Sequence, residues 1–470
     1  MGETEGGVSR RTMFGVAATA AASALGLTAC GGSDDASSGP VTTAPSEAEA
    51  IAKDAYIFGF PLVLMDVTRA AAAARTPANR FQHAAALATP ARRDVVRVNL
   101  DTLYSSAWLD LRAEPMVLQV PAMADRYWLM QVLDAWTNTA HNPSSVRPHA
   151  KSGPPYTYAI VGPNWSGTLP DDVMPLPVPT PTVWLLGRIQ VNGTDDLAAV
   201  HALQQQLRLE PLSNWTERRP APTVPPAPQA DSTPPAKQVA ELDARTFFDR
   251  LCAVLAINPP APDDAPAMKR LATIGITPGG SVVGLSDAEL SSAVDTARQQ
   301  IPVYLDPKSM NENGWTFDPA IGTYGTNYLQ RAAIAWKGLG ANLPQDAIYP
   351  TLFATAGANG STGRFRLHFP AGQTPPVDAF WSLTAYGADN YLLSNPAGIY
   401  AIGHQVPVVP NPDGSIDLAV QQADPGPEVP PGNWLPIPGS GQFSLTLRLY
   451  APKEDAIQGR WQPPPLTPVS

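Results

Sequence analysis

The amino-acid sequence predicts a mainly β protein with a helical connector, in which one β-sandwich precedes the helices and a second follows them. From residue 95 to residue 192, short apolar runs are broken by Pro, Gly and Asn, as is typical of sandwich strands. Residues 238–350 show helical spacing and helix caps, and residues 351–470 return to strand patterns. Proline supplies 53 of the 470 residues, which argues against an all-helical bundle.

Composition and charge exclude several classes of protein. With 44% hydrophobic and 15% charged residues, the chain can bury a large core and is not a mainly disordered protein. Its formal net charge is -10, so we expect neither nucleic acid nor an anionic lipid surface as a general partner.

The first 29 residues predict an export signal rather than part of the fold. Ser9-Arg10-Arg11-Thr12-Met13-Phe14 is similar to a twin-arginine motif, and an alanine-rich apolar run follows it. Leu27-Thr28-Ala29-Cys30 then resembles a bacterial lipobox, whose cysteine thiol accepts a lipid. We therefore expect a lipoprotein anchored through Cys30 on the outer side of the cytoplasmic membrane, or on the outer membrane of a Gram-negative cell. The alternative is a cleaved signal with a chance cysteine.

Residues 30–45 are small and polar, which predicts a flexible tether. The chain has 2 cysteines, so a lipidated Cys30 leaves Cys252 without a disulfide partner.

The N-terminal domain is predicted over residues 46–217. It opens with a capping box from Ser46 to Glu49 and a helix that Pro61 kinks or ends. A second amphipathic helix is expected over residues 195–207. Several strands are apolar on both faces, as in a sandwich interior. The candidate strands are residues 106–110, 127–133, 156–161 and 183–191.

Residues 218–237 are dense in proline and predict a linker. The helical connector that follows, residues 238–350, contains a second capping box from Ser286 to Glu289 and a helix that ends near Gly340. In the C-terminal domain, residues 351–470, the strands 364–369 and 443–450 alternate between apolar and polar residues, and 379–386 is apolar on both faces. Turn signals between such strands favour a jelly roll or a related sandwich.

The densest group of polar and aromatic residues lies at residues 98–110. Asn99 and Asp101 are two residues apart, so a strand would project both from one face, with Tyr104 on the other. A carboxylate beside an amide and a phenol can hold a hydroxylated ligand or act as a general base. The alternative is a structural turn built on Asp101.

Asp134, Asn138 and Arg147 form a second candidate group, because polar residues just after a buried strand often line a ligand site. Arg147 can clamp a carboxylate or phosphate, or else pair with Asp101 or Asp134. A third group is a basic strip predicted on the C-terminal sheet, with solvated surface as its alternative. Its members are Arg364, Arg366, His368 and Arg448.

No phosphate loop, zinc-peptidase motif or nucleophile elbow is present in the sequence. The 6 histidines are scattered, so no metal site and no cofactor are predicted.

Many separated motifs nevertheless resemble a known pair of families. The N-terminal half is similar to domain-of-unknown-function family 1254 in Asn99-Leu100-Asp101-Thr102-Leu103-Tyr104-Ser105, Gly162-Pro163-Asn164-Trp165 and Leu186-Gly187-Arg188. The C-terminal half is similar to family 1214 in Gly322-Thr323-Tyr324-Gly325, Asn433-Trp434-Leu435-Pro436 and Arg448-Leu449-Tyr450. The resemblance implies an immunoglobulin-like sandwich, a helical connector and a jelly-roll-like sandwich, and it implies no activity.

Three functions stay open at this level. The first is an envelope protein that binds a glycan, a lipid or a small molecule in a cleft of the N-terminal sandwich, with Asn99, Asp134, Asn138 and Arg147 as ligand contacts. The second is a hydrolase with Asp101 and Tyr104 as catalytic residues and Asn99 and Arg147 in support. The third is a structural envelope protein. The oligomeric state is not predicted.

Overall fold

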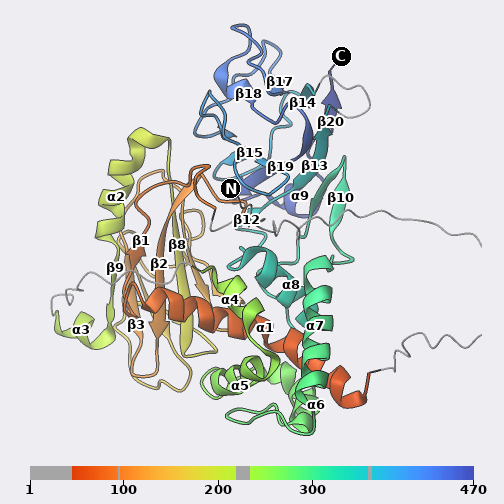
Figure 1. Cartoon of the computed structure of the whole chain (residues 1–470). Helices are drawn as coiled ribbons and strands as arrows, with labels where there is room; N and C mark the ends of the chain where they lie inside the picture. Colours follow the sequence, from red (N-terminus) through yellow and green to blue (C-terminus); the bar gives the residue numbers. More distant parts are fainter. Residues whose placement is uncertain (1–44, 94–95, 219–232, 358–362, 470) are drawn as a thin grey trace, which may run out of the picture. The chain divides into compact units, whose positions relative to one another are not determined.

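The computed structural model describes residues 45–93, 96–218, 233–357 and 363–469 (Figure 1). The predicted signal peptide, Cys30 and nearly all of the predicted tether therefore lie outside the described residues. Over the described ranges the chain is mainly β with a helical layer, so the predicted fold class is confirmed.

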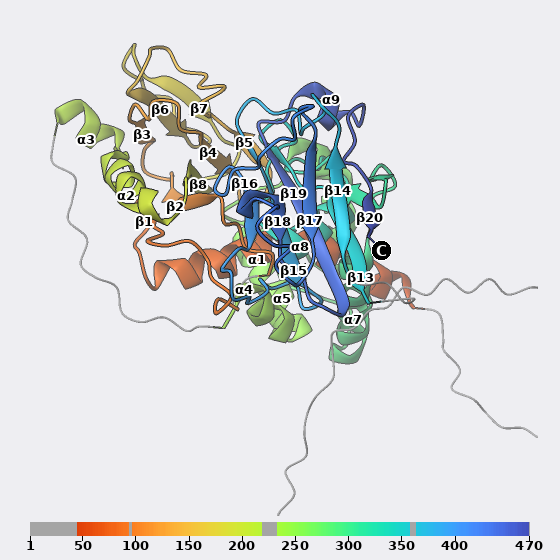
Figure 2. The same cartoon turned by 90° about the horizontal axis from the view of Figure 1, so that it is seen from above.

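The N-terminal sandwich consists of two sheets that share an apolar core (Figure 2). The first sheet has the order β1 (Gln82–His83), β2 (Thr102–Asp110), β8 (Thr182–Gln190), β4 (Trp128–Leu133) and β5 (Thr139–His141). The second has the order β7 (Met174–Pro177), β6 (Tyr156–Val161), β3 (Met116–Val120) and β9 (Arg208–Pro211). Two helices, α2 (Leu197–Gln206) and α3 (Leu212–Glu217), flank β9 in the sequence.

The side chains of β2 show why the first sheet is buried on both faces. Leu103, Ala107 and Leu109 point into the sandwich core, as strand alternation requires. Trp108, on the opposite face, packs against Trp184 of β8 with parallel rings 5.2 Å apart, in a cluster that includes Met65. The outer face is therefore covered by the helical layer rather than by water.

The helical layer begins with α1 (Glu47–Ala73), whose cap is the Ser46 hydroxyl accepting from the Glu49 amide at 3.1 Å. The helix runs through Pro61 without ending, contrary to one expectation. Because its residues from Ile51 to Val67 are almost all buried among other helices, packing offsets the hydrogen bond that proline removes.

The other helices of the layer come from the connector. They are α4 (Pro235–Glu241), α5 (Ala244–Leu255), α6 (Ala265–Leu271), α7 (Asp287–Val303) and α8 (Tyr328–Gly338). The capping box at Ser286 and Glu289 is present at the start of α7. Helix α4 starts inside the segment predicted as linker, because proline is tolerated in a first helical turn.

The C-terminal sandwich also has two sheets around one core (Figure 2). The larger has the order β10 (Met310–Glu312), β11 (Trp315–Phe317), β13 (Thr351–Ala356), β19 (Gly441–Tyr450), β15 (Trp381–Gly387) and β16 (Ala401–Gly403), and β12 (Ala347–Ile348) pairs with β19. The smaller has the order β18 (Trp434–Leu435), β17 (Ile416–Val420), β14 (Phe365–Phe369) and β20 (Leu466–Pro468). A short helix, α9 (Glu454–Ile457), follows β19.

The larger sheet turns a polar face toward the N-terminal sandwich. In β19, the side chains of Leu445, Leu447 and Leu449 enter the core, so Arg448 and Tyr450 lie on the other face. That face is buried, although it is polar.

Among the described helices, none combines the length and the apolar character needed to cross a membrane.

Candidate functional site

Asn99 and Asp101 lie just before β2, where the N-terminal sandwich meets the polar face of the C-terminal sheet. The Asn99 Oδ1 atom accepts from the Asp101 amide at 2.6 Å, so this turn is built on Asn99 and not on Asp101. The Asn99 Nδ2 group donates to Thr102 Oγ1 at 2.7 Å and to the Tyr104 hydroxyl at 3.2 Å. The strand alternation predicted for Asn99 and Asp101 is wrong, because the strand begins only at Thr102.

The carboxylate of Asp101 joins the two sandwiches. Its side chain is 1% exposed, and its Oδ2 atom accepts from Ser382 Oγ at 2.7 Å and from the Tyr450 hydroxyl at 3.0 Å. Both donors belong to the larger C-terminal sheet. A buried carboxylate needs such partners, since an unpaired buried charge is strongly destabilising.

His404, just after β16, faces the other oxygen of this carboxylate. Its Nε2 atom lies 2.9 Å from the Val191 carbonyl oxygen, which accepts only and so fixes the hydrogen on Nε2. The Nδ1 atom then carries a lone pair and lies 3.6 Å from Asp101 Oδ1, too far for a hydrogen bond. In the described structure neither His404 Nδ1 nor Asp101 Oδ1 has a hydrogen-bond partner. Burial lowers the pKa of His404, and the charge of Asp101 acts in the opposite direction.

A cavity of about 450 Å³ lies beside this pair, and the His404 ring forms part of its wall. The Phe380 ring is in contact with His404, at a centroid distance of 4.1 Å, and with Tyr450, at 4.3 Å. Apolar and aromatic residues of the C-terminal domain make up most of the remaining wall. They are Pro375, Val377, Ala379, Trp381, Pro407 and Val408, with Thr374 and Gly403. The cavity therefore lies in the C-terminal domain and not, as predicted, in the N-terminal sandwich. The N-terminal sandwich contributes Asp101, which lies behind the His404 ring.

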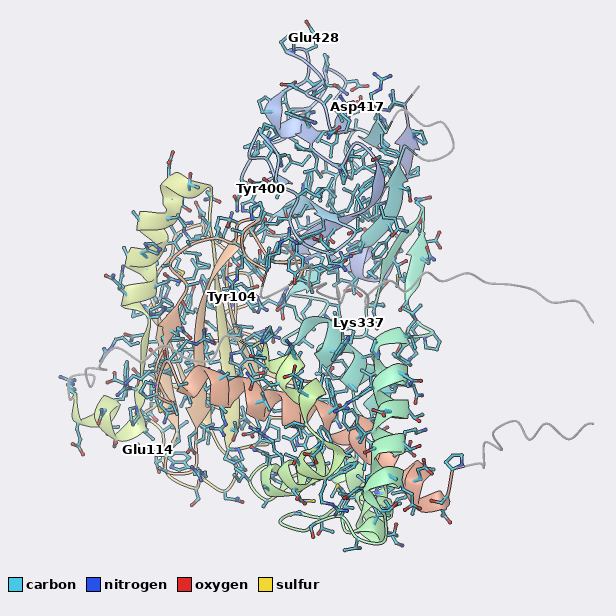
Figure 3. All side chains as sticks on the ribbon, viewed as in Figure 1. Tyr104, Glu114, Lys337, Tyr400, Asp417 and Glu428 are labelled. Atoms are coloured by element: carbon cyan, nitrogen blue, oxygen red, sulfur yellow. The ribbon has the colours of Figure 1, made fainter. Side chains whose placement is uncertain are left out.

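Tyr104 extends the same interface along β2 (Figure 3). It is paired across the sheet with Arg188 of β8, whose guanidinium carbon lies 5.3 Å from the centre of the Tyr104 ring. Arg188 is buried and approaches the C-terminal end of α8, where it donates to the Gly340 carbonyl at 3.2 Å. Gly340 has a φ of +81°, the left-handed conformation that a glycine often adopts after a helix, and the helix ends near it as predicted.

Asp134 and Asn138 lie in a separate cluster after β4. Asp134 Oδ1 accepts from the amides of Trp136 and Asn138, both at 2.8 Å, and its Oδ2 accepts from Asn138 Nδ2 at 3.0 Å. Burial raises the pKa of Asp134, which these hydrogen bonds oppose. Asn138 Oδ1 also accepts from the Tyr324 amide at 3.3 Å, so the pair holds a turn against the connector.

Arg147 forms an ion pair with neither of the partners expected for it. Its Nη2 atom lies 3.0 Å from Oδ1 of Asp346, a carboxylate of the connector with a fully buried side chain. Asn142 Nδ2 donates to the other oxygen of Asp346 at 2.7 Å. Burial raises the pKa of Asp346, although these two partners lower it. Of the predicted site residues, Asn99, Asp101 and Tyr104 come together, while Arg147 lies beside Asp346.

The predicted basic strip is wrong in one member. Arg366 and His368 of β14 share Asp417 on an exposed surface, whereas Arg448 belongs to the other sheet and is 4% exposed. Alternation placed Arg448 away from the core correctly, but could not show that a second domain covers that face. His404, Ser382 and Tyr450 were not predicted as site residues, because their contact with Asp101 joins distant parts of the sequence.

Within the described ranges, no three His, Cys, Asp or Glu side chains gather as a metal site would require. The thiol of Cys252 is free and buried.

Comparison with known proteins finds two family matches in the chain. Residues 78–211 match the family described as protein of unknown function (DUF1254), and residues 346–454 match protein of unknown function (DUF1214). No curated protein matches the chain.

Two solved structures are similar to the chain. The crystal structure of the VPA0106 protein from Vibrio parahaemolyticus is 22% identical, with a TM-score of 0.66 over 90% of this chain and 100% of that one. A putative uncharacterized protein from Burkholderia cenocepacia is 15% identical, with a TM-score of 0.41 over 90% of this chain and 92% of that one. The first of these supports the fold. The chain therefore contains one segment that matches the DUF1254 family, residues 78–211, and one that matches the DUF1214 family, residues 346–454.

Proposed function

We propose that this chain is a bacterial cell-envelope lipoprotein that binds a compact hydroxylated ligand, such as a sugar residue of a glycan, in the cavity beside His404. The observation that carries the proposal is His404 itself, an imidazole in a cavity wall with the Asp101 carboxylate behind it. A titratable group that combines burial, a charged partner and a cavity is typical of functional sites.

The chemistry of the wall favours a sugar over a fully apolar ligand. Trp381 and Phe380 offer flat apolar surfaces, on which the C–H face of a sugar ring can stack. Thr374 supplies a polar side chain that can orient a hydroxyl.

A glycan array tests this proposal with the purified protein. We expect the wild type to bind at least one array glycan and Trp381→Ala to lose that binding. Trp215→Ala is the matched control, because Trp215 is a partly buried tryptophan on α3, outside the cavity wall. Glycan binding that persists in Trp381→Ala contradicts the proposed cavity. If the wild type binds no glycan on the array and no lipid in a pull-down, ligand binding itself is contradicted.

A hydrolase is the second candidate, and the Asp101–His404 pair is what favours it. In such an enzyme His404 would act as general base through its Nδ1 atom, and the Asp101 carboxylate, 3.6 Å from that atom, would stabilise the imidazolium that forms. Panels of ester, amide and glycoside substrates test this reading. Any detected hydrolysis should fall at least roughly a hundredfold in His404→Gln, the usual contribution of a general base. An activity that is unchanged in this variant excludes the pair as its source.

The membrane anchor is proposed from the order of the export motif, the apolar run and the lipobox-like segment. Mass spectrometry of the mature N-terminus should find a lipid-modified Cys30, and Cys30→Ser should release the protein from the membrane fraction. An unmodified Cys30 on a released chain contradicts the anchor.

A further inference from the structure

Three arginine side chains lie between the two sandwiches without a carboxylate partner. Arg188 is 6% exposed and Arg448 4% exposed, while Arg97 is half-buried. Within the described part of the chain, none of the three forms an ion pair, and their hydrogen-bond partners are all neutral. Arg188 donates to Gln131 Oε1 at 2.7 Å and to a backbone carbonyl.

The other two arginines are held in the same way. Arg448 donates to Thr384 Oγ1 at 2.8 Å, to the Tyr386 hydroxyl at 2.5 Å and to backbone carbonyls. Arg97 donates to Thr446 Oγ1 at 3.0 Å, Asn390 Oδ1 at 2.8 Å and Ser444 Oγ at 3.1 Å. These contacts fix the positions of the guanidinium groups and leave their charges unneutralised.

The nearby anionic groups do not balance this charge. Asp101 interacts electrostatically with Arg448, and Asp346 with Arg188, so the three arginines and Arg147 have two carboxylates among them. Asp346 is already paired with Arg147. Tyr349 and Tyr450 stay neutral at physiological pH, since burial raises the pKa of Tyr349 to about 12 and raises that of Tyr450 as well. Because a buried charge is costly without a partner, a surplus of two positive charges favours an anion.

Two phenols add donors to this cluster. The Tyr349 hydroxyl accepts from Asn342 Nδ2 at 2.6 Å, and the Tyr104 hydroxyl accepts from Asn99 Nδ2 at 3.2 Å. Each O–H hydrogen therefore remains available for a further acceptor. Tyr349 interacts electrostatically with both Arg188 and Arg448, which places it near both guanidinium groups. Tyr104 and Tyr349 are only partly buried, unlike the two arginines.

We propose that Arg188, Arg448, Tyr104 and Tyr349 bind an oxyanion, the carboxylate or phosphate group of a small ligand, at the interface between the two sandwiches. Guanidinium groups and phenolic O–H donors match the oxygens of such a group. This site stands on different contacts from the cavity beside His404 and does not require the proposed function.

The test uses inorganic phosphate and acetate as probes, with sodium chloride at matched ionic strength. The thermal midpoint of the wild-type protein should rise with the concentration of at least one probe and not with chloride. Arg188→Met should remove this rise. Arg126→Met should keep it, because Arg126 is paired with Asp196 and takes no part in this cluster.

Tyr349→Phe provides a second variant that deletes one O–H and leaves every arginine in place. Loss of a hydrogen bond to a charged group should weaken anion binding roughly tenfold. If neither probe stabilises the wild type beyond chloride, or if the rise survives in both Arg188→Met and Tyr349→Phe, the site is not there. A silent glycan array would leave this result untouched, so the two proposals fail separately.

Discussion

Replacing Tyr450 by Phe should weaken the interface between the two sandwiches. The ring of Tyr450 is 1% exposed, and its hydroxyl lies 3.0 Å from Asp101 Oδ2 and 3.3 Å from Asn99 Oδ1. A phenol has one hydrogen, so it donates to the nearer, charged oxygen. A hydrogen bond to a charged group contributes about 1.5–3 kcal/mol, and the variant leaves Asp101 Oδ2 with Ser382 as its remaining donor. We therefore expect the free energy of unfolding to fall by about 1.5–3 kcal/mol.

Tyr127→Phe is the matched control for this change. Tyr127 is also buried, and its ring is 5.9 Å from that of Tyr450, but its hydroxyl donates to the neutral carbonyl of Asp346 at 3.4 Å. That loss should be about 0.5–1.5 kcal/mol. Urea unfolding of both variants, with the slope checked for a shared transition, measures the difference. Equal losses in the two variants would refute the special role given to the Asp101 carboxylate.

Two further predictions concern the pH dependence of stability and the packing of α1. Burial lowers the pKa of His404 in the folded protein below its ordinary 6.5, so the unfolded chain binds the proton more tightly. The stability that the neutral imidazole contributes is therefore present above pH 6.5. It is lost as the pH falls through the lower pKa of the folded state. Urea midpoints measured across that range should show a smaller acid-side loss in His404→Gln, and an unchanged loss would contradict the assignment. A Cβ atom at Gly59 would lie 2.4 Å from Leu251 Cδ2, so Gly59→Ala should destabilise the protein, since overpacking costs about 1–3 kcal/mol against roughly 1 kcal/mol of gained helix propensity. In a Leu251→Ala background, Gly59→Ala should become stabilising. Thermal unfolding of the wild type, the two single variants and the double variant measures this coupling, and purely additive effects would contradict the proposed clash between the two side chains.

The sequence predicts those parts of the fold that local patterns encode. The side chains of strand β14 alternate between core and surface. The sequence predicts this strand over residues 364–369, and the structure has it at Phe365–Phe369. The caps at Ser46 and Ser286 also follow from residues within one helical turn. Strand β3 was missed, because Met116–Val120 is a short apolar run between prolines and shows no alternation by which to recognise it.

The candidate site was only partly predictable, for a different reason. Asn99, Asp101 and Tyr104 are close in sequence, so their polar character stood out together. His404 reaches the same carboxylate from a loop of the other domain, and no periodicity relates two such positions. Arg448 shows the same limit, since alternation gives the face of a strand but not what covers that face.

The central position of α1 has a consequence for the biosynthesis of the protein. This helix precedes in the sequence the helices that cover its apolar surface, α5, α7 and α8, which are therefore translated after it. At about 5–20 residues per second, the ribosome needs roughly 10–50 s to pass from the end of α1 to the end of α8. Native neighbours from the connector first become available with α4 and α5, and this layer can close only after α8 has been synthesised.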